Sequence, residues 1–391
     1  MRSVIVLGST GSIGTQALDL IRAHPGRFAV LGLAAGGGNL QLLAEQIVEF
    51  APAKVTLASG DADELRELVA MTAEAAHCER PEFMLEIGLL AAPALARVSA
   101  DVVLNAITGA AGLLATISAL EASNTLALAN KESLVIGGRM AADLAAPGQI
   151  VPVDSEHSAI AQSLLAGTHG EIARLILTAS GGPFRGWTRN QLAAVTPEQA
   201  LAHPTWNMGR VVTINSSTLV NKGLELIEAH LLFDVPFDRI QVVVHPQSVV
   251  HSGVEFADGA LITQASPPDM KIPIALGLDW PRRLPHVAQP CDFTTASTWT
   301  FEPLDEAVFP AVALARRAGE AGGTAPAVFN AANEACVDAF CARKIGFLDI
   351  TATIARVLDQ HLASGFIDDA NATLDDVLAA DHWGRAAVSS A

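Results

Sequence analysis

The stretch VIVLGSTGSIG, residues 4–14, decides the expected fold, because a short apolar run is followed at once by three glycines spaced GxxGxxG. An apolar run of four residues that ends at glycine is typical of a buried strand. Glycines after such a strand allow a tight turn, close approach of the backbone to a pyrophosphate, and tight packing of the next helix, which we expect to start near Ser12. A glycine triplet alone is a weak signal, but its place after the first strand predicts a dinucleotide site.

Residues 1–150 continue this pattern, since short apolar runs alternate with amphipathic segments. Strands that alternate with helices form a parallel, doubly wound sheet, so we predict a Rossmann-like dinucleotide-binding domain here. The stretch 102–122 carries no charge before Glu121, but Asn105 and Gly109 interrupt it, and it fits a strand, a turn and a helix better than a membrane span. The further predicted strands are 28–33, 55–57, 102–104 and 125–128.

The second strand runs into LAAGGGNL, residues 33–40, where a site for NAD usually carries an acid for the ribose hydroxyls. No Asp or Glu occurs there, and the small residues around Gly36 and Asn39 leave room for a 2′-phosphate, so we favour NADPH. The segment ANKES follows the last strand of this domain. Ligands of open α/β sheets bind beyond the carboxyl ends of the strands, so Asn130, Lys131 and Glu132 are expected to face the cofactor.

Acidic residues gather in two further segments. Asp154 and Glu156 follow an apolar run in VPVDSEH, residues 151–157, and in an extended chain this spacing points both carboxylates to one side. Glu225 lies in SSTLVNKGLELIE, residues 216–228. Three carboxylates suit a hard divalent cation such as Mg²⁺ or Mn²⁺, while Lys222 and its hydroxyl and amide neighbours suit a phosphate. The alternative is a solvated strand end, since acids are mostly exposed.

The middle of the chain offers two loops with alternative interpretations. SGGPF, residues 180–184, either lets the backbone approach a ligand or is an ordinary tight turn. HPTWNMGR, residues 203–210, is either a lid that closes over a ligand or a loop whose tryptophan anchors the core. Strands are then predicted at 240–244, 249–256 and 260–264, with a hairpin at Ala257–Asp258–Gly259, and this sheet supports a dimer interface or the back wall of the site. His245 and His251 in these strands are expected to be structural.

Composition narrows the class of protein. The chain has 391 residues, half of them hydrophobic, which is enough for two or three domains. A formal net charge of −17 argues against nucleic-acid binding. The four cysteines have no CxxC spacing, and the chain starts in a strand without signal-peptide features, so a cytoplasmic protein with reduced thiols and no membrane segment is expected.

The predicted organisation has three domains and a linker. Residues 1–150 form the cofactor-binding domain, and 151–280 form a central α/β catalytic and metal-binding domain. Residues 281–306, rich in Pro, Thr and Ser, are predicted to be a linker. Residues 307–391 carry apolar stripes at helical spacing and predict a helical bundle, with Asn330, Asn333 and Glu334 used for capping and packing.

Seven motifs in order, GSTGSIG, ANKES, PVDSEHSAI, SGGPF, HPTWNMG, NKGLE and HPQSVVHS, resemble the 1-deoxy-D-xylulose 5-phosphate reductoisomerase family. The resemblance extends from the first strand to the C-terminal helices. It implies rearrangement of 1-deoxy-D-xylulose 5-phosphate to a branched aldehyde, followed by reduction to 2-C-methyl-D-erythritol 4-phosphate in non-mevalonate isoprenoid biosynthesis. The implied cofactors are NADPH and Mg²⁺ or Mn²⁺, with Co²⁺ as a third candidate, and the implied assembly is a homodimer.

The resemblance also implies roles for individual residues. Asp154, Glu156 and Glu225 match the metal ligands, and together with Lys131 and His203 they are the expected catalytic residues. His251 matches a histidine near the active site, and GGGN at residues 36–39 departs from the Lys or Arg that many members carry. The expected substrate-binding residues are Lys131, Ser155, Glu156, Ser180, His203, Trp206, Ser216, Asn221, Lys222 and Glu225. The expected cofactor-binding residues are Gly8, Thr10, Gly11, Ser12, Ile13, Gly36, Asn39, Asn130, Glu132 and Gly209.

Two other functions are open from the residues alone. A plain NADPH dehydrogenase with a structural metal, or with none, accounts for residues 1–150 but gives Asp154, Glu156 and Glu225 no task. A cofactor-binding regulator or scaffold without turnover leaves the lid segment unexplained. Metal-dependent turnover separates the first hypothesis from both alternatives.

Overall fold

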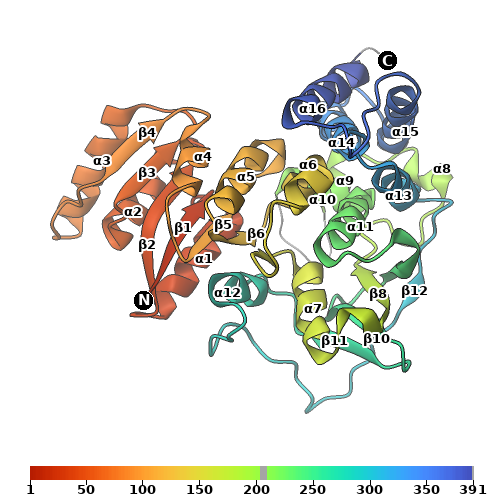
Figure 1. Ribbon diagram of the computed structural model, residues 1–391, viewed down its shortest axis with the longest axis horizontal. Coiled ribbons are helices and arrows are strands. Elements are labelled where there is room, and N and C mark those ends of the chain that lie inside the picture. The colour runs from red at the N-terminus through yellow and green to blue at the C-terminus, as the bar shows by residue number, and fades with distance from the viewer. Residues whose placement is uncertain (203–208, 390–391) are drawn as a thin grey trace. The chain divides into compact units, whose positions relative to one another are not determined.

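The chain is described here from a computed structural model, in which residues 1–202 and 209–389 are described (Figure 1). They divide into two compact units, each built from three stretches of sequence. Unit 1 comprises Met1–Asn130, Leu144–Asp154 and Met270–Ala288, and unit 2 comprises Lys131–Asp143, Ser155–Asp269 and Gln289–Ala391. The predicted boundaries at residues 150, 280 and 306 do not coincide with these units, and the three-domain division stays a prediction.

Unit 1 contains a seven-stranded parallel sheet in the order β4-β3-β2-β1-β5-β6-β7. Strand β1 lies between β2 and β5, so the order of strands reverses beside it, and in such sheets ligands bind outside the carboxyl ends at this point. The predicted α/β fold is confirmed. The strands are β1 (Arg2–Leu7), β2 (Phe28–Ala35), β3 (Lys54–Leu57), β4 (Met84–Ile87), β5 (Val102–Asn105), β6 (Thr125–Leu128) and β7 (Ile150–Pro152).

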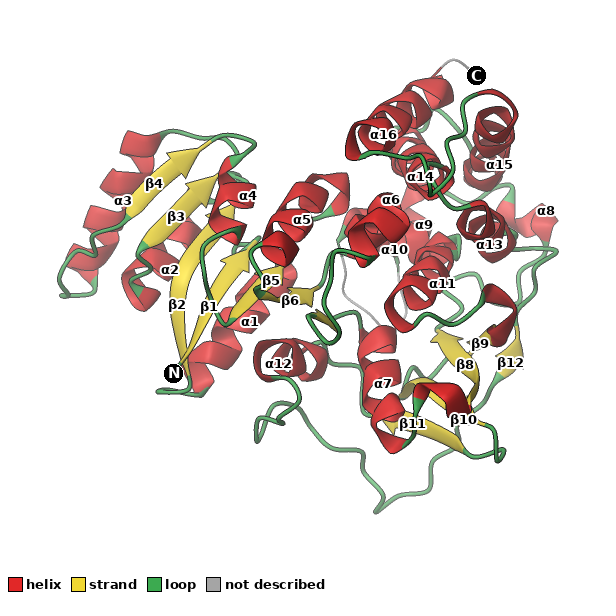
Figure 2. Cartoon of the chain, in the orientation of Figure 1, coloured by secondary structure: helices red, strands yellow, loops and turns green. Residues whose placement is uncertain are grey.

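Helices pack against this sheet (Figure 2). The core between them consists of strand and helix side chains such as Leu18 and Leu33, which are almost completely buried. The predicted strand, turn and helix in 102–122 are confirmed as β5, a 3₁₀ turn at Gly109–Gly112 and α5. Among the described residues, no helix has both the length and the apolar character that a membrane crossing requires. The helices are α1 (Ser12–Ala23), α2 (Leu40–Phe50), α3 (Ala62–Ala75), α4 (Ala91–Ala96), α5 (Leu113–Glu121) and α12 (Lys271–Asp279).

Helix α12 joins unit 1 from far along the sequence, and it packs against α1 and strands β5–β7. Gly277 allows the close approach, because a Cβ there would lie 2.8 Å from a methyl group of Val153. Asp279, whose side chain is 1% exposed, accepts hydrogen bonds from Arg2 at 3.1 Å and from Nε of Arg27 at 3.0 Å. A buried carboxylate needs such partners, so these ion pairs fix the helix to the first two strands.

Unit 2 contains a five-stranded sheet in the order β11-β10-β8-β9-β12, where only β8 and β9 are parallel to each other. The predicted hairpin is confirmed, because Gly259 N–H donates to the Phe256 carbonyl and β10 pairs with β11 in antiparallel fashion. Helix α7 (Ser155–Ser163) packs against β10 and β11. The strands are β8 (Ile172–Ala179), β9 (Ile240–Val244), β10 (Val250–Phe256), β11 (Leu261–Ala265) and β12 (Glu302–Pro303).

The remaining helices of unit 2 include the predicted C-terminal bundle, α13 (Ala311–Ala321), α14 (Ala325–Cys341), α15 (Phe347–Ser364) and α16 (Leu374–Ser389). Val135 of α6 (Lys131–Ala142) and Leu224 of α11 (Val220–Phe233) are buried in the same core as this bundle. Helix α11 contacts both α6 and α13, so the bundle holds two helices that carry predicted site residues. The shorter helices are α8 (Arg189–Leu192), α9 (Pro197–Leu201) and α10 (Arg210–Ser217), with 3₁₀ turns at Leu164–Ala166, His169–Glu171 and Phe237–Arg239.

One local prediction is wrong. Asp154 and Glu156 were expected to share one side of an extended chain, but β7 ends at Pro152 and Glu156 lies in the first turn of α7. An acid in the first turn is favoured by the partial positive charge at a helix N-terminus, which explains why the helix starts here. The approach of the two carboxylates therefore results from a strand-to-helix transition.

The pairing of Asp279 predicts its contribution to stability. Asp279→Ala removes the carboxylate that two arginines share, and we expect the free energy of unfolding of unit 1 to fall by about 2 kcal/mol. Urea titration followed by circular dichroism measures this change. Asp359→Ala is the matched control, because Asp359 pairs with Arg317 at an exposed position and its loss should cost less than about 1 kcal/mol. Equal effects of the two substitutions would contradict the assignment.

Candidate active site

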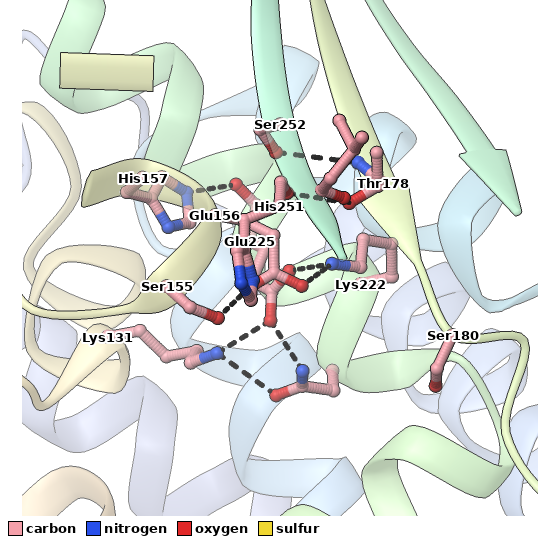
Figure 3. Close-up of polar contacts among 12 residues, drawn as sticks. Lys131, Ser155, Glu156, His157, Thr178, Ser180, Lys222, Glu225, His251 and Ser252 are labelled. Carbon is pink, nitrogen blue, oxygen red and sulfur yellow. Dashed lines mark hydrogen bonds and ion pairs between the residues drawn. The ribbon is translucent and has the colours of Figure 1, made fainter. Parts of the chain in front are cut away.

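Three carboxylates meet at the start of α7 and on α11. Asp154 immediately precedes α7, Glu156 lies in the first turn of that helix, and Glu225 lies on α11. One oxygen of each side chain lies within 4.8 Å of the others, and the side chain of Glu225 is only 1% exposed. Figure 3 shows Glu156 and Glu225 of this cluster. The structure thus brings together the three residues predicted to bind a metal.

Two lysines pair with Glu156 and Glu225 of this cluster, and Figure 3 shows them approaching Glu225 from different sides. Lys131 Nζ lies 2.8 Å from Glu225 Oε1, and Lys222 Nζ lies 2.7 Å from Glu156 Oε1 and also pairs with Glu225. Three carboxylates against two ammonium groups leave a net negative charge in a largely buried place. A donor set of carboxylate oxygens with excess negative charge fits a hard divalent cation.

Helix α11 holds three of the predicted residues within its first two turns. Glu225 is four positions after Asn221 and three after Lys222, so its side chain lies next to each of theirs on the helix surface. The amide of Asn221 donates to Glu225 Oε1 and its carbonyl oxygen accepts from Lys131 Nζ at 3.1 Å. Leu219, at φ 62°, precedes the helix and sets the direction in which it starts. These contacts hold the Glu225 carboxylate in one orientation.

A histidine that was not predicted lies behind this cluster. His157 is completely buried, its Nε2 lies 2.8 Å from the main-chain carbonyl of Glu225, and its Nδ1 lies 3.3 Å from Glu228 Oε2. A carbonyl only accepts, so Nε2 carries a hydrogen. Asp154, His157 and Glu228 also have ligand atoms within 4.8 Å of one another, but the ring nitrogens of His157 already face these two partners, so the all-oxygen set is the better cation site.

Of the set formed by Asp154, His157 and Glu228, the sequence carried a signal for Glu228, because it follows Glu225 by three residues and both acids can lie on one side of a helix. His157 is adjacent to Glu156 in the sequence, but nothing in the local pattern indicated that its ring would support the backbone of α11. Contacts between α7 and α11 join residues far apart along the chain, so they are visible only in the fold.

The loop SGGPF, residues 180–184, packs against Ser216 at the start of the segment 216–228. Gly181 and Gly182 have φ of 84° and 65°, and a Cβ on Gly182 would lie 2.7 Å from the Ser216 carbonyl. The Ser180 hydroxyl accepts a hydrogen bond from Gly182 N–H at 3.2 Å, so the turn is closed on itself. The glycines therefore let the loop that carries Ser180 approach the backbone of Ser216, which places two predicted substrate-binding residues near each other.

The glycine turn after β1 has the geometry expected of a cofactor site. Gly8 has φ of 83°, and a Cβ there would lie 2.6 Å from the Ala106 carbonyl. A Cβ on Gly14 would lie 2.2 Å from the Gly8 carbonyl, so the turn is compatible only with glycine at these positions. Helix α1 begins at Ser12, and its N-cap Gly11 has no side chain to cover the helix end. A helix N-terminus with exposed backbone suits a phosphate group.

The other predicted cofactor residues differ in their exposure and in their contacts. Gly36 is exposed with open space around it, and Asn39 caps α2 by accepting from Leu42 N–H at 3.1 Å. The buried amide of Asn130 donates to the Gly109 carbonyl at 2.9 Å, so it supports the loop after β5. Glu132 is buried in the first turn of α6, and Gly209 is the N-cap of α10.

The structure describes the contacts of two of the predicted histidines, His245 and His251. His245 is structural as predicted, since Nδ1 lies 2.8 Å from the Thr300 carbonyl and Nε2 accepts from the N–H groups of Val249 and Val250. His251 Nε2 lies 3.1 Å from the Ser266 hydroxyl. His203 and Trp206, predicted for the lid, lie outside the described residues.

Comparison with known proteins decides the family. Profiles of 1-deoxy-D-xylulose 5-phosphate reductoisomerase match residues 4–138, and profiles of its C-terminal domains match 150–233 and 265–387. The protein named 1-deoxy-D-xylulose 5-phosphate reductoisomerase in Cutibacterium acnes is 61% identical over 98% of this chain and 97% of its own length. The chain belongs to the 1-deoxy-D-xylulose 5-phosphate reductoisomerase family.

Solved structures of reductoisomerases have the same fold. The reductoisomerase from Zymomonas mobilis in complex with NADPH is 39% identical, with a TM-score of 0.88, and the match covers all of this chain and 98% of that one. A reductoisomerase in complex with NADPH, fosmidomycin and magnesium is 35% identical, with a TM-score of 0.90 and the same coverage. Recognition of the family from the sequence motifs is confirmed.

The carboxylate cluster predicts the effect of a single isosteric change. Glu225→Gln removes one negative charge and keeps the shape of the side chain, so we expect Mn²⁺ to bind at least about tenfold more weakly. Electron paramagnetic resonance of free Mn²⁺ measures the affinity without any turnover. Glu255→Gln is the matched control, because Glu255 of β10 pairs with the exposed Arg174 of β8, and the affinity of this variant for Mn²⁺ should equal that of the wild type. Unchanged Mn²⁺ binding by Glu225→Gln would show that the ion binds elsewhere.

Proposed function

We propose that this chain catalyses the NADPH- and divalent-metal-dependent conversion of 1-deoxy-D-xylulose 5-phosphate to 2-C-methyl-D-erythritol 4-phosphate in isoprenoid biosynthesis. The observation that carries the proposal is the cluster of Asp154, Glu156 and Glu225 with two lysines against it, in a chain that belongs to the reductoisomerase family. A dehydrogenase without a metal would have no need of three carboxylates in one largely buried place.

The cation proposed for Asp154, Glu156 and Glu225 is Mg²⁺, with Mn²⁺ or Co²⁺ as further candidates, because the donors are all carboxylate oxygens. When bound, the cation would polarise oxygen atoms of the substrate, and NADPH would supply the hydride. The buried environment strengthens the action of every charge around these oxygens, since water screens them poorly there.

Lys131 is proposed to place positive charge beside the reacting oxygens of the substrate. Its ammonium group is already held at the site by Glu225 and by Asn221 at 3.1 Å, so it needs little reorganisation to act there. Lys131 is also the first residue of α6, whose later residues are packed into the core of unit 2. The lysine is therefore presented from a helix whose first turns are buried.

Binding of the phosphate end of the substrate is proposed for four polar residues of unit 2. Their hydroxyl, amide and ammonium groups can donate to phosphate oxygens, and binding of this remote group orients the carbon atoms that react. Ser155 is placed beside Glu156, to which its hydroxyl donates, so we assign it to the reacting end. The four proposed phosphate ligands are Ser180, Ser216, Asn221 and Lys222.

The cofactor site is proposed at the turn after β1 in unit 1. Thr10, Ser12 and Ile13 would offer backbone N–H groups to the pyrophosphate at the start of α1, and Gly11, whose own N–H donates to the Gly8 carbonyl, would let the phosphate approach the backbone. The open space at Gly36 and the amide of Asn39 suit the 2′-phosphate of NADPH, because no acid of the second strand end opposes it. We retain Asn130, Glu132 and Gly209 as proposed cofactor residues.

The function is tested by following the loss of NADPH absorbance with 1-deoxy-D-xylulose 5-phosphate. We expect turnover with Mg²⁺ present and none in excess chelator. Lys131→Ala should lower turnover roughly 100- to 1,000-fold while the affinity for NADPH stays nearly unchanged, because the lost charge acts on the reacting atoms. Lys344→Ala, at an exposed position, is the control and should behave as the wild type. Undiminished turnover in chelator would refute the proposed function, and equal loss of binding and turnover in Lys131→Ala would make the lysine a cofactor ligand.

A homodimer in the cytoplasm is also proposed. Strand β11 lies at one end of the five-stranded sheet, and Leu261 and Ile262 are 50% and 37% exposed there. An edge strand carries backbone groups that can pair with a second copy of the chain. The free cysteines Cys78 and Cys336, one exposed and one buried, fit a reducing compartment.

The proposed dimer predicts the effect of a charge on β11. Ile262→Lys should convert the dimer into a monomer in sedimentation experiments, because it places a charge in the apolar contact. Leu165→Lys, at another exposed apolar position of unit 2, should leave the dimer intact. A wild-type chain that sediments as a monomer would refute this part of the proposal.

A further inference from the structure

We propose that Gln46 is a positioning residue for the cofactor, and that it aims the Thr10 amide at the diphosphate of NADPH. The inference rests on the proposed function and extends it to a residue of α2 that no motif marked. Gln46 is 5% exposed, and its Nε2 donates a hydrogen bond of 2.9 Å to the main-chain carbonyl of Ser9. Ser9 belongs to the glycine turn and is completely buried.

Because the peptide bond is planar, the contact between Gln46 and the Ser9 carbonyl also determines the direction of the Thr10 N–H. The Ser9 carbonyl and the Thr10 N–H belong to one planar trans peptide, in which the C=O and N–H bonds point in opposite directions. Because Gln46 is buried, its hydrogen bond holds the carbonyl toward the interior of unit 1. The Thr10 N–H must then point away from Gln46. Exposure increases from Ser9 through Thr10 to Gly11, so this direction leads out toward the open end of the turn.

The backbone fixes the turn on both sides of this peptide. The N–H groups of Gly8 and Ser9 both donate to the Ala34 carbonyl, at 2.8 and 2.9 Å, and Gly11 N–H donates to the Gly8 carbonyl at 3.0 Å. These bonds set the path of the chain but do not involve the Ser9 carbonyl. The Gln46 side chain therefore supplies a contact that sets the rotation of the Ser9–Thr10 peptide.

The polar atoms around this contact indicate a role beyond folding. The Gln46 Oε1 atom and the Ser9 hydroxyl are buried and have no hydrogen-bond partner within the described part of the chain. Such atoms are unfavourable in a protein interior, so the packing of α2 alone does not account for a glutamine at this position. Polar groups that break the rules of good packing are expected at functional sites. The α2 helix also begins beside Asn39, a proposed cofactor residue, so it connects two parts of the proposed site.

The test compares Gln46→Met with Gln41→Met. Both substitutions replace glutamine by an apolar side chain of similar length on α2, but Gln41 is exposed and donates to the side chain of Glu45. Affinities are measured by calorimetry for NADPH and for two fragments, 2′-phospho-ADP-ribose, which keeps the diphosphate, and adenosine 2′-monophosphate, which lacks it. We expect Gln46→Met to weaken NADPH and 2′-phospho-ADP-ribose about tenfold and to leave adenosine 2′-monophosphate unchanged, whereas Gln41→Met changes none of them.

Each other outcome overturns the inference. Equal weakening of both fragments by Gln46→Met would mean general damage to unit 1, and unchanged affinity for both would mean that the contact has no role in binding. Gln46→Met could also lower the stability of the chain. In that case the ratio of the two fragment affinities, measured on one sample, still shows whether the loss is specific to the diphosphate. A wild-type chain that binds neither NADPH nor 2′-phospho-ADP-ribose would refute the proposed function itself, which is a different result from loss in the variant alone.

Discussion

Neutralisation of buried carboxylates is the constraint on which the rest of unit 2 depends. Glu225 is almost completely buried, and a buried charge is tolerated only when it is paired. Its partners come from its own helix α11 and from the first residue of α6, so both helices must stay in register with each other. The C-terminal bundle achieves this by packing against α11 and α6 together. The bundle therefore serves the site although none of its residues was assigned to it.

Unit 1 depends on a steric constraint at the glycine turn after β1. The turn after β1 brings backbone atoms so close that a methyl group on Gly8 or Gly14 would collide with carbonyl oxygens. This compactness leaves the peptide groups of the turn as the main polar groups available to a ligand, and their orientation becomes the property that decides binding. A buried amide from α2 controls one of these orientations. The turn of unit 1 thus depends on backbone geometry, whereas Glu225 in unit 2 depends on the pairing of a buried charge.

The sequence predicted those features that have a local cause. Strand β1, the glycine turn and the C-terminal helices follow from apolar runs, glycine spacing and helical periodicity. The three metal-binding candidates were found because they belong to recognisable motifs. Strand β4 was missed because it is an edge strand whose residues, such as Met84, are mostly exposed and lack an apolar pattern. The contacts of His157 with α11 and of Gln46 with Ser9 were missed because they join side chains to backbone atoms far away in sequence, where no periodicity exists.

The return of α12 to unit 1 has a consequence for biosynthesis. The chain passes between the units several times, and the carboxylate of Asp279, which binds Arg2 and Arg27, is among the last parts of unit 1 to be translated. During synthesis on the ribosome, the first strands must wait for most of the polypeptide to emerge before their arginines find this partner. Neither unit corresponds to a continuous gene fragment, so the two halves could not have been exchanged independently by simple recombination at one boundary.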